Sequence, residues 1–414
     1  MVSTVFMTRR SKRNEQLLHD ANKLLRDPAL LFRVSNQIEA AGVVGEKTNG
    51  LVITLATLTT QTRSPVSIML KGGSSSGKSN LAVGVLSLLP DDMVIDRTGL
   101  SPKALAYGEE DLDGKVLYIT ELHGAKDAQY LLRLLQSEGA LNYEYATVRG
   151  NERETRLAQR SGQVVVITTT TLNSIFEDDE TRFLSLWVDT SEKQTRNVLL
   201  SEIRPPANPN THERYVIRKA ISILREHAIS VKLPDWFEVV AKHVPATTLR
   251  SRRDWPRFLS LCKAIALIRA HRADPQKPSA AVVDFSDYAV AYRLLNGVFS
   301  RTPTKKRSST DGLVTAVETL FAEHGAAVSV REVAQFLGWE EGRTYKHAKA
   351  AVERDALRYE DGNRINNKKR MIPNGCGLGD FLISPTGLLR LQPKLKGCSF
   401  VDPITGETKI IGKI

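Results

Sequence analysis

The sequence predicts an α/β protein in which a mostly parallel sheet is flanked by helices, with further helical segments before and after it. First, short apolar runs alternate with amphipathic helical patterns, which is typical of parallel sheets. Second, a Gly/Ser-rich stretch, GGSSSGKS at 72–79, lies between the first apolar run and a helical pattern. Third, the pattern is helical on both sides, at 12–62 and from about 190 to 300. The apolar runs lie at 67–70, 115–120, 157–171 and 184–188.

The elements follow in order along the chain. Leucines recur near helical spacing in the first 25 residues, and Asp27-Pro28 marks a break before a second helix. The stretch 128–139 reads as a helix that ends at Gly139. The segment 141–148 alternates like a strand, and the polar segment 149–156 is expected to be the turn that follows it.

Composition indicates an ordinary core and an anionic partner. The 414 residues carry a formal net charge of +12, with 41% hydrophobic and 25% charged residues. Nucleic acid is the commonest partner of so basic a chain, although a basic surface can also serve solubility alone. The length favours two or three domains.

Cysteine and histidine usage argues against several classes of site. The three cysteines, Cys262, Cys376 and Cys398, form no CxxC pair, and the eight histidines are dispersed. We therefore expect neither a disulfide framework nor a structural zinc, and a reducing compartment fits. No apolar run approaches the roughly 20 residues that span a bilayer, and the N-terminus does not match a secretory signal. The expected location is the cytoplasm, without a membrane partner.

The stretch GGSSSGKS fits the phosphate-binding pattern G-x-x-x-x-G-K-[ST]. Its glycines let the backbone curl so that successive N–H groups point at phosphate oxygens. Lys78 is expected to neutralise the β- and γ-phosphates of ATP, and the Ser79 hydroxyl to ligate Mg²⁺. The helix that follows presents its positive end to the anion. The nucleotide-binding residues expected here are Gly72, Gly73, Ser74, Ser75, Ser76, Gly77, Lys78, Ser79 and Asn80.

A carboxylate at the end of a neighbouring strand is the second element that ATP hydrolysis needs. Glu121 follows the apolar run VLYIT, where it can polarise the attacking water or hold Mg²⁺ through water. The usual pattern at this place is Asp-Glu, and Thr120 stands in the Asp position. A strand-end glutamate that caps the next helix is the structural alternative.

About 50 residues after Glu121, a strand that ends in TTTT is followed by Asn173, a short acidic segment and another strand. This arrangement resembles an AAA+ ATPase module. In that family a polar first sensor at this place orients the attacking water, and Thr170, Thr171 and Asn173 match its position. Arg182, in the ETRF stretch, resembles the family's arginine finger, which stabilises charge on a neighbouring subunit's nucleotide. An ordinary salt-bridged arginine is the alternative.

An apparent hairpin at 141–165 precedes the sensor strand. It resembles the pre-sensor-1 β-hairpin of superfamily 3 and MCM-like helicases, whose tips line the pore of a hexamer and grip the DNA backbone. Arg149, Arg153 and Arg156 lie in its expected turn, where basic side chains suit phosphate contact. A solvated turn whose charges protect the sheet edge is the alternative.

The resemblance covers roughly residues 30–300. The stretch 249–270 resembles the second-sensor helix of the MCM lid, in which Arg252 or Arg253 would reach the γ-phosphate. The chain is similar to MCM-like AAA+ helicases of bacterial mobile elements, and to the ATPase half of CHC2-type primase relatives without their zinc finger. The implied organisation is an N-terminal helical region (1–62), an AAA+ P-loop core (63–190), a helical lid (191–300), a linker (301–312), a winged helix (313–372) and a tail (373–414).

The C-terminal region predicts a winged helix-turn-helix, because three short helical patterns are followed by a hairpin pattern. Segment 341–355 is the expected recognition helix, with Thr344, His347 and Lys349 also near its exposed face. A winged helix that binds protein is the alternative. The Gly-rich string at 375–379 reads as a loop. The residues expected to contact DNA here are Arg343, Lys346, Lys368, Lys369 and Arg370.

Three functions fit these features. The first is an ATP-driven DNA helicase or translocase. It is expected to form a ring, a hexamer, that uses ATP and Mg²⁺ to move along single-stranded or forked DNA. A primase or initiator of the same element is a candidate partner. The second is a DNA-binding ATPase switch that loads or initiates without processive unwinding. The third is a winged-helix regulator. The basic hairpin favours the first over the third, and Thr120 favours the second, because slow hydrolysis suits a switch.

Overall fold

The computed structural model describes residues 2–412 except 63, 150–151, 172–179, 204–210, 228, 247–249, 301–308, 325–326, 354–356, 360–369, 374–380 and 393. The chain forms two compact units. The first comprises Met1–Pro234, Arg253–Leu294 and Phe400–Lys409. The second comprises Asp235–Arg252, Leu295–Ser399 and Ile410–Ile414.

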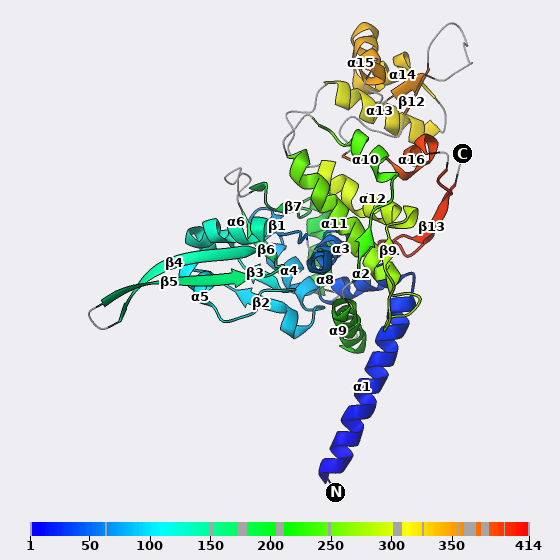
Figure 1. The fold of residues 1–414 in the computed structure, drawn as a ribbon. Helices are drawn as coiled ribbons and strands as arrows, with labels where there is room; N and C mark the ends of the chain where they lie inside the picture. Colours follow the sequence, from blue (N-terminus) through cyan, green and yellow to red (C-terminus); the bar gives the residue numbers. More distant parts are fainter. Residues whose placement is uncertain are drawn as a thin grey trace. The chain divides into compact units, whose positions relative to one another are not determined.

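A five-stranded sheet forms the centre of the first unit (Figure 1). All its neighbouring strands pair in parallel, which confirms the predicted parallel sheet. Strand β6 lies between β1 and β3, so the carboxyl ends of these three strands meet at one edge. The order across the sheet is β2 (Val94–Arg97), β3 (Val116–Ile119), β6 (Val165–Thr170), β1 (Ile68–Lys71) and β7 (Leu184–Trp187).

Helices cover both faces of this sheet. On one face, Met69, Leu117 and Val166 join a buried apolar cluster with residues of α5 and α6. On the other face, α4 contacts β6, and α2 and α3 pack on α4. Helix α3 is buried from Gly50 to Leu58, which explains its apolar sequence. These helices are α2 (Leu30–Ala40), α3 (Lys47–Leu58), α4 (Lys78–Leu86), α5 (Pro102–Tyr107) and α6 (Gln129–Glu138).

The N-terminal helix α1 (Val2–Arg26) packs against α9 (Thr211–Glu226). The predicted break at Asp27-Pro28 is confirmed, and the Asp27 carboxylate accepts a hydrogen bond of 2.8 Å from the backbone N–H two residues later. Arg33 of α2 forms an ion pair of 2.7 Å with Glu213 of α9. These contacts attach the N-terminal helices to the rest of the first unit.

The predicted hairpin is present as β4 (Ala140–Arg149) and β5 (Glu152–Ser161), an antiparallel pair that projects from the sheet (Figure 1). The turn predicted at 149–156 is wrong in its length. Strand β5 already begins at Glu152, and Arg153 pairs with Val148. The sequence of β5 is mostly polar and charged and lacks the regular apolar alternation that marks a strand, so this strand is hidden in the sequence.

The base of the hairpin is anchored on α5. The Tyr107 ring centroid lies 4.2 Å from that of Tyr145 and 6.0 Å from that of Tyr143. The Arg160 guanidinium donates a hydrogen bond of 2.7 Å to the Leu105 carbonyl. Aromatic packing and a charge-assisted hydrogen bond therefore hold the root of the hairpin against the core.

The chain after β7 is largely helical, as predicted. Short strands β8 (Val231–Lys232) and β9 (Ala281–Val282), which the sequence did not predict, pair in parallel. The other helices of this region are α8 (Glu192–Ile203), α10 (Phe237–His243), α11 (Ser251–Ala270) and α12 (Phe285–Ser300).

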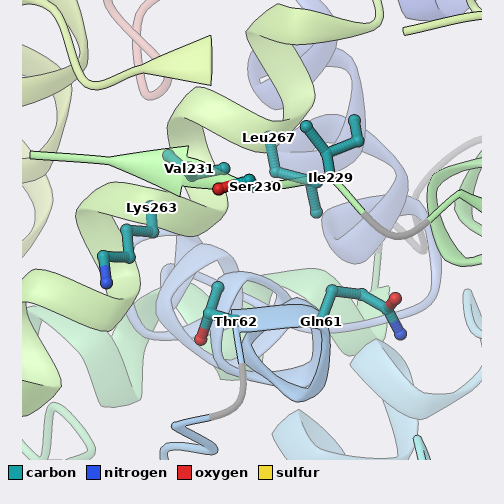
Figure 2. A pocket seen from close by; sticks show the side chains of 7 residues that line it. All are labelled: Gln61, Thr62, Ile229, Ser230, Val231, Lys263 and Leu267. Carbon is teal, nitrogen blue, oxygen red and sulfur yellow. The ribbon is translucent and has the colours of Figure 1, made fainter. Parts of the chain in front are cut away.

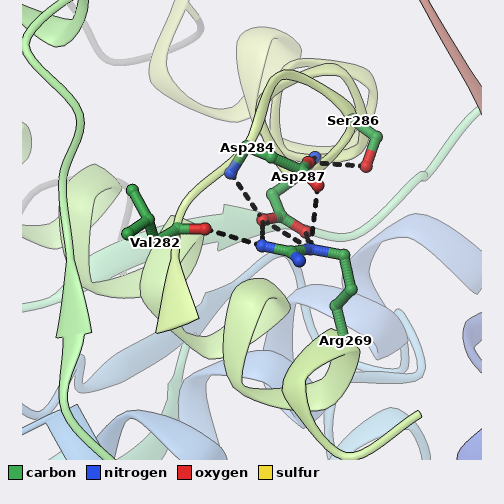
Figure 3. Close-up of polar contacts among 5 residues, drawn as sticks. All are labelled: Arg269, Val282, Asp284, Ser286 and Asp287. Atoms are coloured by element: carbon green, nitrogen blue, oxygen red, sulfur yellow. Dashed lines mark hydrogen bonds and ion pairs between the residues drawn. The ribbon is translucent and has the colours of Figure 1, made fainter. Parts of the chain in front are cut away.

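Arg269 ties α11 to the start of α12 (Figure 3). Its guanidinium donates to both carboxylate oxygens of Asp287 and lies 3.1 Å from the Asp284 carboxylate. Burial raises the pKa of Asp287 to about 6, although Arg269 opposes this shift. The same guanidinium donates to the Val282 carbonyl at 2.6 Å, so one side chain joins α11, β9 and α12.

The second unit contains the three predicted C-terminal helices and a small antiparallel sheet of order β10-β12-β11. Ser329 and Glu332 form a reciprocal cap at the start of α14, and Gly338 ends that helix with φ +63°, where glycine is favoured. The loop between β11 and β12 lies outside the described residues. The elements are α13 (Ser309–His324), β10 (Val328–Ser329), α14 (Val330–Leu337), α15 (Glu341–Glu353), β11 (Leu357–Tyr359) and β12 (Arg370–Pro373).

The segment expected to be a tail contains regular structure: α16 (Pro385–Leu391), β13 (Cys398–Val401) and β14 (Thr408–Ile411). Asp402 is fully buried there and accepts from Arg293 of α12 and from Lys409. Burial raises the pKa of Asp402, but the hydrogen bonds from Lys409, from the backbone and from Arg293 outweigh it and hold the pKa at about 2.

Asp402→Asn is expected to destabilise the protein at neutral pH. The folded-state pKa lies below the unfolded value of 3.8, so the carboxylate stabilises the fold above pH 4 and loses this contribution as the pH falls through about 2. Because Arg293 and Lys409 are each about 40% exposed, we expect a loss on the order of 1 kcal/mol. Urea unfolding at pH 7 and pH 2.5 measures it. A difference that does not shrink at the lower pH contradicts the assignment.

Candidate nucleotide-binding site

The Gly/Ser loop joins the carboxyl end of β1 to the amino end of α4, as the sequence predicts. Gly77 caps the helix with φ +87°, and Ser75 has φ +61°, a conformation that a side chain rarely adopts. A Cβ on Gly72 would lie 2.5 Å from the Val188 side chain and 2.7 Å from the Ser76 hydroxyl. The loop backbone is therefore held in a tight curl that faces the start of α4.

Lys78 is buried at the centre of this curl, with 7% of its surface exposed. Its ammonium donates to the carbonyls of Gly72 at 2.9 Å and Gly73 at 2.6 Å. Burial lowers the pKa of Lys78, and the negative charge of Glu121 opposes this shift. The structure thus brings Lys78 and Glu121, which lie 43 positions apart in the sequence, within electrostatic range of each other.

The carboxyl ends of β3 and β6 meet beside the loop. The Thr169 hydroxyl donates to the Thr120 carbonyl at 2.7 Å, and the Thr120 N–H donates to the Arg97 carbonyl at 3.1 Å. These bonds fix the backbone from which the exposed Glu121 projects. Thr170 is buried at the end of β6, opposite Lys71. Asn173 lies outside the described residues.

Lys71, the last residue of β1, was not singled out in the sequence. Its side chain is completely buried and forms an ion pair with Glu180, and its ammonium lies 5.5 Å from the centre of the Trp187 ring. Glu180 belongs to the ETRF stretch before β7. A buried lysine is stable only when it is paired, so this pair fixes the segment of Glu180 against the strand that leads into the phosphate loop.

Arg182 contacts α6 of its own chain. Its guanidinium donates to the Arg133 carbonyl at 3.3 Å and to the Ser137 hydroxyl, both on α6. Arg253, on α11, donates to the Thr181 hydroxyl next to Arg182. Arg252 falls in the second compact unit. The structure therefore brings Arg182 and Arg253 to one segment.

A second loop beside α4 was missed by the sequence reasoning. Asn80 donates to the Gly42 carbonyl at 2.9 Å, and Gln194 donates to the Val44 carbonyl at 2.5 Å. Glu46 accepts from the Asp189 N–H at 2.6 Å, directly after β7. The pattern GVVG at 42–45 was the available signal, since glycines on either side of two valines favour a tight loop.

The residues expected to contact DNA are distributed over both units. Arg149, Arg153 and Arg156 lie on the strands of the hairpin, Arg149 beside its tip. On α15, Arg343 and Lys346 are exposed, and the Arg343 guanidinium lies 4.4 Å from the centre of the Trp339 ring.

Thr344 and Arg370 in the C-terminal region are held against their own unit. Thr344 is fully buried, so placing it on the exposed face of the recognition helix was wrong; the helix turns this position toward the core that includes Ala348. Arg370 donates to the Ala327 carbonyl at 3.1 Å, which holds it against its own unit. Lys368, Lys369 and the string at 375–379 lie outside the described residues.

The oxygen donors at the loop suit a magnesium ion. The exposed hydroxyl of Ser79 and the carboxylate of Glu121 are the hard ligands that Mg²⁺ prefers, and the positive phosphate loop complements its nucleotide. Over the described ranges, no cluster of three or more histidine, cysteine and acidic side chains forms a further metal site.

A separate cavity of about 440 Å³ shares no residue with the loop (Figure 2). It lies between η1 (Thr59–Thr62), β8 and α11, and its lining includes Gln61, Ser230 and Lys263. None of the helices that the structure describes is both long and apolar enough to cross a membrane.

Comparison with known proteins gives one family match. Residues 17–225, half of the chain, match the family described as the MTBMA_p00010 P-loop domain. No curated protein matches the sequence. Among solved structures, a full-length MCM homolog from Methanopyrus kandleri is similar at a TM-score of 0.44 and 16% identity. The match covers 67% of this chain and 60% of that chain, so it spans less than two thirds of the solved protein.

Proposed function

This chain belongs to the MTBMA_p00010 P-loop domain family, and we propose that it is an ATP-driven DNA helicase or translocase. The observation that carries the proposal is the approach of Glu121 to Lys78 at the carboxyl edge of a parallel sheet. A phosphate-binding lysine and a carboxylate in range of it are the two groups that hydrolysis of a nucleoside triphosphate needs.

The loop supplies a defined role for each group. In the present conformation Lys78 donates to two carbonyls of its own loop. On binding of ATP, Lys78 exchanges these carbonyls for oxygens of the β- and γ-phosphates, and the loop N–H groups and the start of α4 bind the remaining charge. Bound Mg²⁺, held by Ser79, supplies neutralisation of the phosphate charge. Glu121 accepts a proton from the water that attacks the γ-phosphate, and a polar group after β6 orients that water.

The hairpin supports DNA as the partner. Its base is fixed on α5, its strands project from the sheet, and basic residues lie along the end farthest from the base. In a ring of several copies of the chain, the basic residues of such hairpins can contact the phosphates of DNA in a shared pore. We propose Arg182 as the residue that reaches a neighbour's nucleotide. To do so it must exchange its contacts with α6.

The elements of the second unit support a further DNA contact. Three helices followed by strands β11 and β12, with β10 completing the sheet, have the order of a winged helix-turn-helix. Arg343 and Lys346 on the exposed side of α15 would contact phosphates, and Arg343 could also read a base. Arg252 and Arg253, at the start of α11, remain proposed γ-phosphate ligands.

A DNA-dependent switch that does not unwind is the second candidate. Thr120 favours it, because the metal side of the site lacks one of its usual carboxylates and hydrolysis should be slow.

A strand-displacement assay on forked DNA separates the two functions. The helicase displaces a labelled strand with ATP and Mg²⁺, and Arg153→Ala reduces displacement while ATP hydrolysis without DNA is kept. Exposed Lys103 on α5 offers a matched basic control, since Lys103→Ala removes one positive charge at the base of the hairpin and not at its arginine-bearing end. Hydrolysis without displacement supports the switch, and equal displacement by the Arg153→Ala variant removes the pore role of the hairpin.

Glu121→Gln is expected to reduce ATP hydrolysis about 100-fold or more while ATP binding is retained, because the amide keeps the shape but cannot accept the proton. Radiolabelled phosphate release and equilibrium binding of a fluorescent ATP analogue measure the two effects. Hydrolysis close to the wild-type rate would show that Glu121 only caps η3 (Leu122–Ala128).

A further inference from the structure

The metal side of the proposed site lacks a carboxylate at position 120. Thr120 offers a hydroxyl there. Its backbone N–H donates to the Arg97 carbonyl, and its carbonyl accepts from the Thr169 hydroxyl. A neutral threonine binds a cation and its water less strongly than a carboxylate does. Another group near Ser79 would therefore have to orient its hydroxyl.

Tyr118 is placed for this role by the register of the sheet. Its partners are Asp96 on β2 and Ile167 on β6, so its side chain lies on the same face of the sheet as theirs. Its neighbours Leu117 and Ile119 point to the opposite face, into the cluster with α5 and α6. Tyr118 thus points to the face covered by α4, the helix that carries Ser79.

The Tyr118 hydroxyl is buried, and the residue is 2% exposed. Thr120 follows Tyr118 by two residues, the spacing that returns an extended chain to the same face, and Ser79 lies in the first turn of α4. Burial raises the pKa of Tyr118, and hydrogen bonding by the nearby side chains of Ser79 and Thr120 opposes this rise. Even so, over the described residues the phenol oxygen makes no hydrogen bond of normal distance and angle. The three hydroxyls are neighbours that are not yet aligned.

A buried hydroxyl without a hydrogen bond destabilises the fold, so such groups usually have a ligand, an ion or a water as partner. Phenylalanine would fill the same space without this cost. The Tyr118 hydroxyl lies next to Ser79, whose hydroxyl must be oriented toward a bound Mg²⁺. The bound state is therefore where its hydrogen bonds are expected to form.

We propose that Tyr118 positions Ser79 for the metal, in place of the absent carboxylate at 120. In the bound state, the Ser79 oxygen points a lone pair at Mg²⁺ and its O–H donates to the Tyr118 oxygen. The Tyr118 O–H in turn donates to the Thr120 hydroxyl. This chain of hydroxyls is neutral, so the site depends on the ion of the Mg·ATP complex rather than on a preloaded metal. The inference rests on the proposed nucleotide site.

Tyr118→Phe tests it, with binding of a fluorescent ATP analogue measured in excess Mg²⁺ and in EDTA. The expected result is a 3- to 10-fold weaker affinity in Mg²⁺, the size of one hydrogen bond, with unchanged affinity in EDTA and no loss of thermal stability. Exposed Tyr130 on α6 provides the control, since Tyr130→Phe removes a hydroxyl outside the site. Adding Thr120→Asp to Tyr118→Phe is expected to restore the affinity in Mg²⁺.

Three other results would contradict the role of Tyr118 or the proposed site itself. Equal affinities of Tyr118→Phe and wild type in Mg²⁺ overturn the positioning role. An equal weakening in Mg²⁺ and EDTA also overturns it, since the hydroxyl would then serve the loop and not the metal. If wild type itself binds the analogue no better in Mg²⁺ than in EDTA, the proposed ATPase site fails before the inference is reached.

Discussion

Lys78→Ala is expected to reduce ATP hydrolysis by roughly 100- to 1000-fold. This is the usual effect of removing a preorganised group that stabilises the negative charge of the transition state. The lysine is 7% exposed, so its charge acts in a partly desolvated site where electrostatic interactions are strong. Its loss also leaves the carbonyls of Gly72 and Gly73 without their present donor. Binding of ATP should weaken together with hydrolysis, because the same ammonium contacts the phosphates in both states.

Two controls separate this effect from general damage. Lys78→Arg keeps the charge but not the size, and it should retain part of the binding, because a guanidinium cannot fit both loop carbonyls in the same curl. Lys103→Ala removes an exposed lysine on α5 and should leave hydrolysis unchanged. ATP hydrolysis by the Lys78→Ala variant at more than a tenth of the wild-type rate would contradict the role of the loop.

Glu180→Ala is expected to lower the free energy of unfolding by about 3–5 kcal/mol, the usual cost of leaving a buried charge without its partner. Lys71 is completely buried, and Glu180 is the ion-pair partner that the structure gives its ammonium. The Trp187 ring lies beside the same ammonium, but a ring face compensates only part of the lost charge. Urea unfolding followed by circular dichroism measures the loss.

Matched variants identify the cause. Glu180→Gln keeps an acceptor and should cost less than Glu180→Ala. The double variant Lys71→Met/Glu180→Leu removes both charges and should recover most of the stability. Glu192→Ala breaks an exposed pair with Arg196 and should cost less than about 1 kcal/mol. Losses of similar size for Glu180→Ala and Glu192→Ala would mean that the Lys71 pair is not buried in solution.

The sequence was sufficient where local signals are strong. The phosphate loop, the helix after it and the strand before Glu121 follow from glycine placement and apolar runs, and the structure confirms these elements. The hairpin could be predicted because apolar and polar residues alternate along β4. Its second strand was hidden because its residues are mostly charged and polar and do not alternate with apolar ones.

Other features depend on contacts between distant segments. Strand β2 is short and half exposed, so its pattern matches a turn as well as a strand. Lys71 looks like a surface lysine until Glu180, more than 100 positions later, is brought beside it. The loop at 42–46 becomes part of the site only when Asn80 and Gln194 bind its carbonyls. No local pattern encodes these pairings, because each joins segments that only the folded chain brings together.

The central claim is that hydrolysis at this loop is coupled to DNA. The rate of ATP hydrolysis per subunit, measured over a range of protein concentrations with and without forked DNA, tests it most directly. If neighbouring copies complete each site, the rate per subunit rises with protein concentration and rises further with DNA, and the Lys78→Ala variant remains at background throughout. A rate that is independent of both protein concentration and DNA, or hydrolysis that survives in the Lys78→Ala variant, would contradict the account.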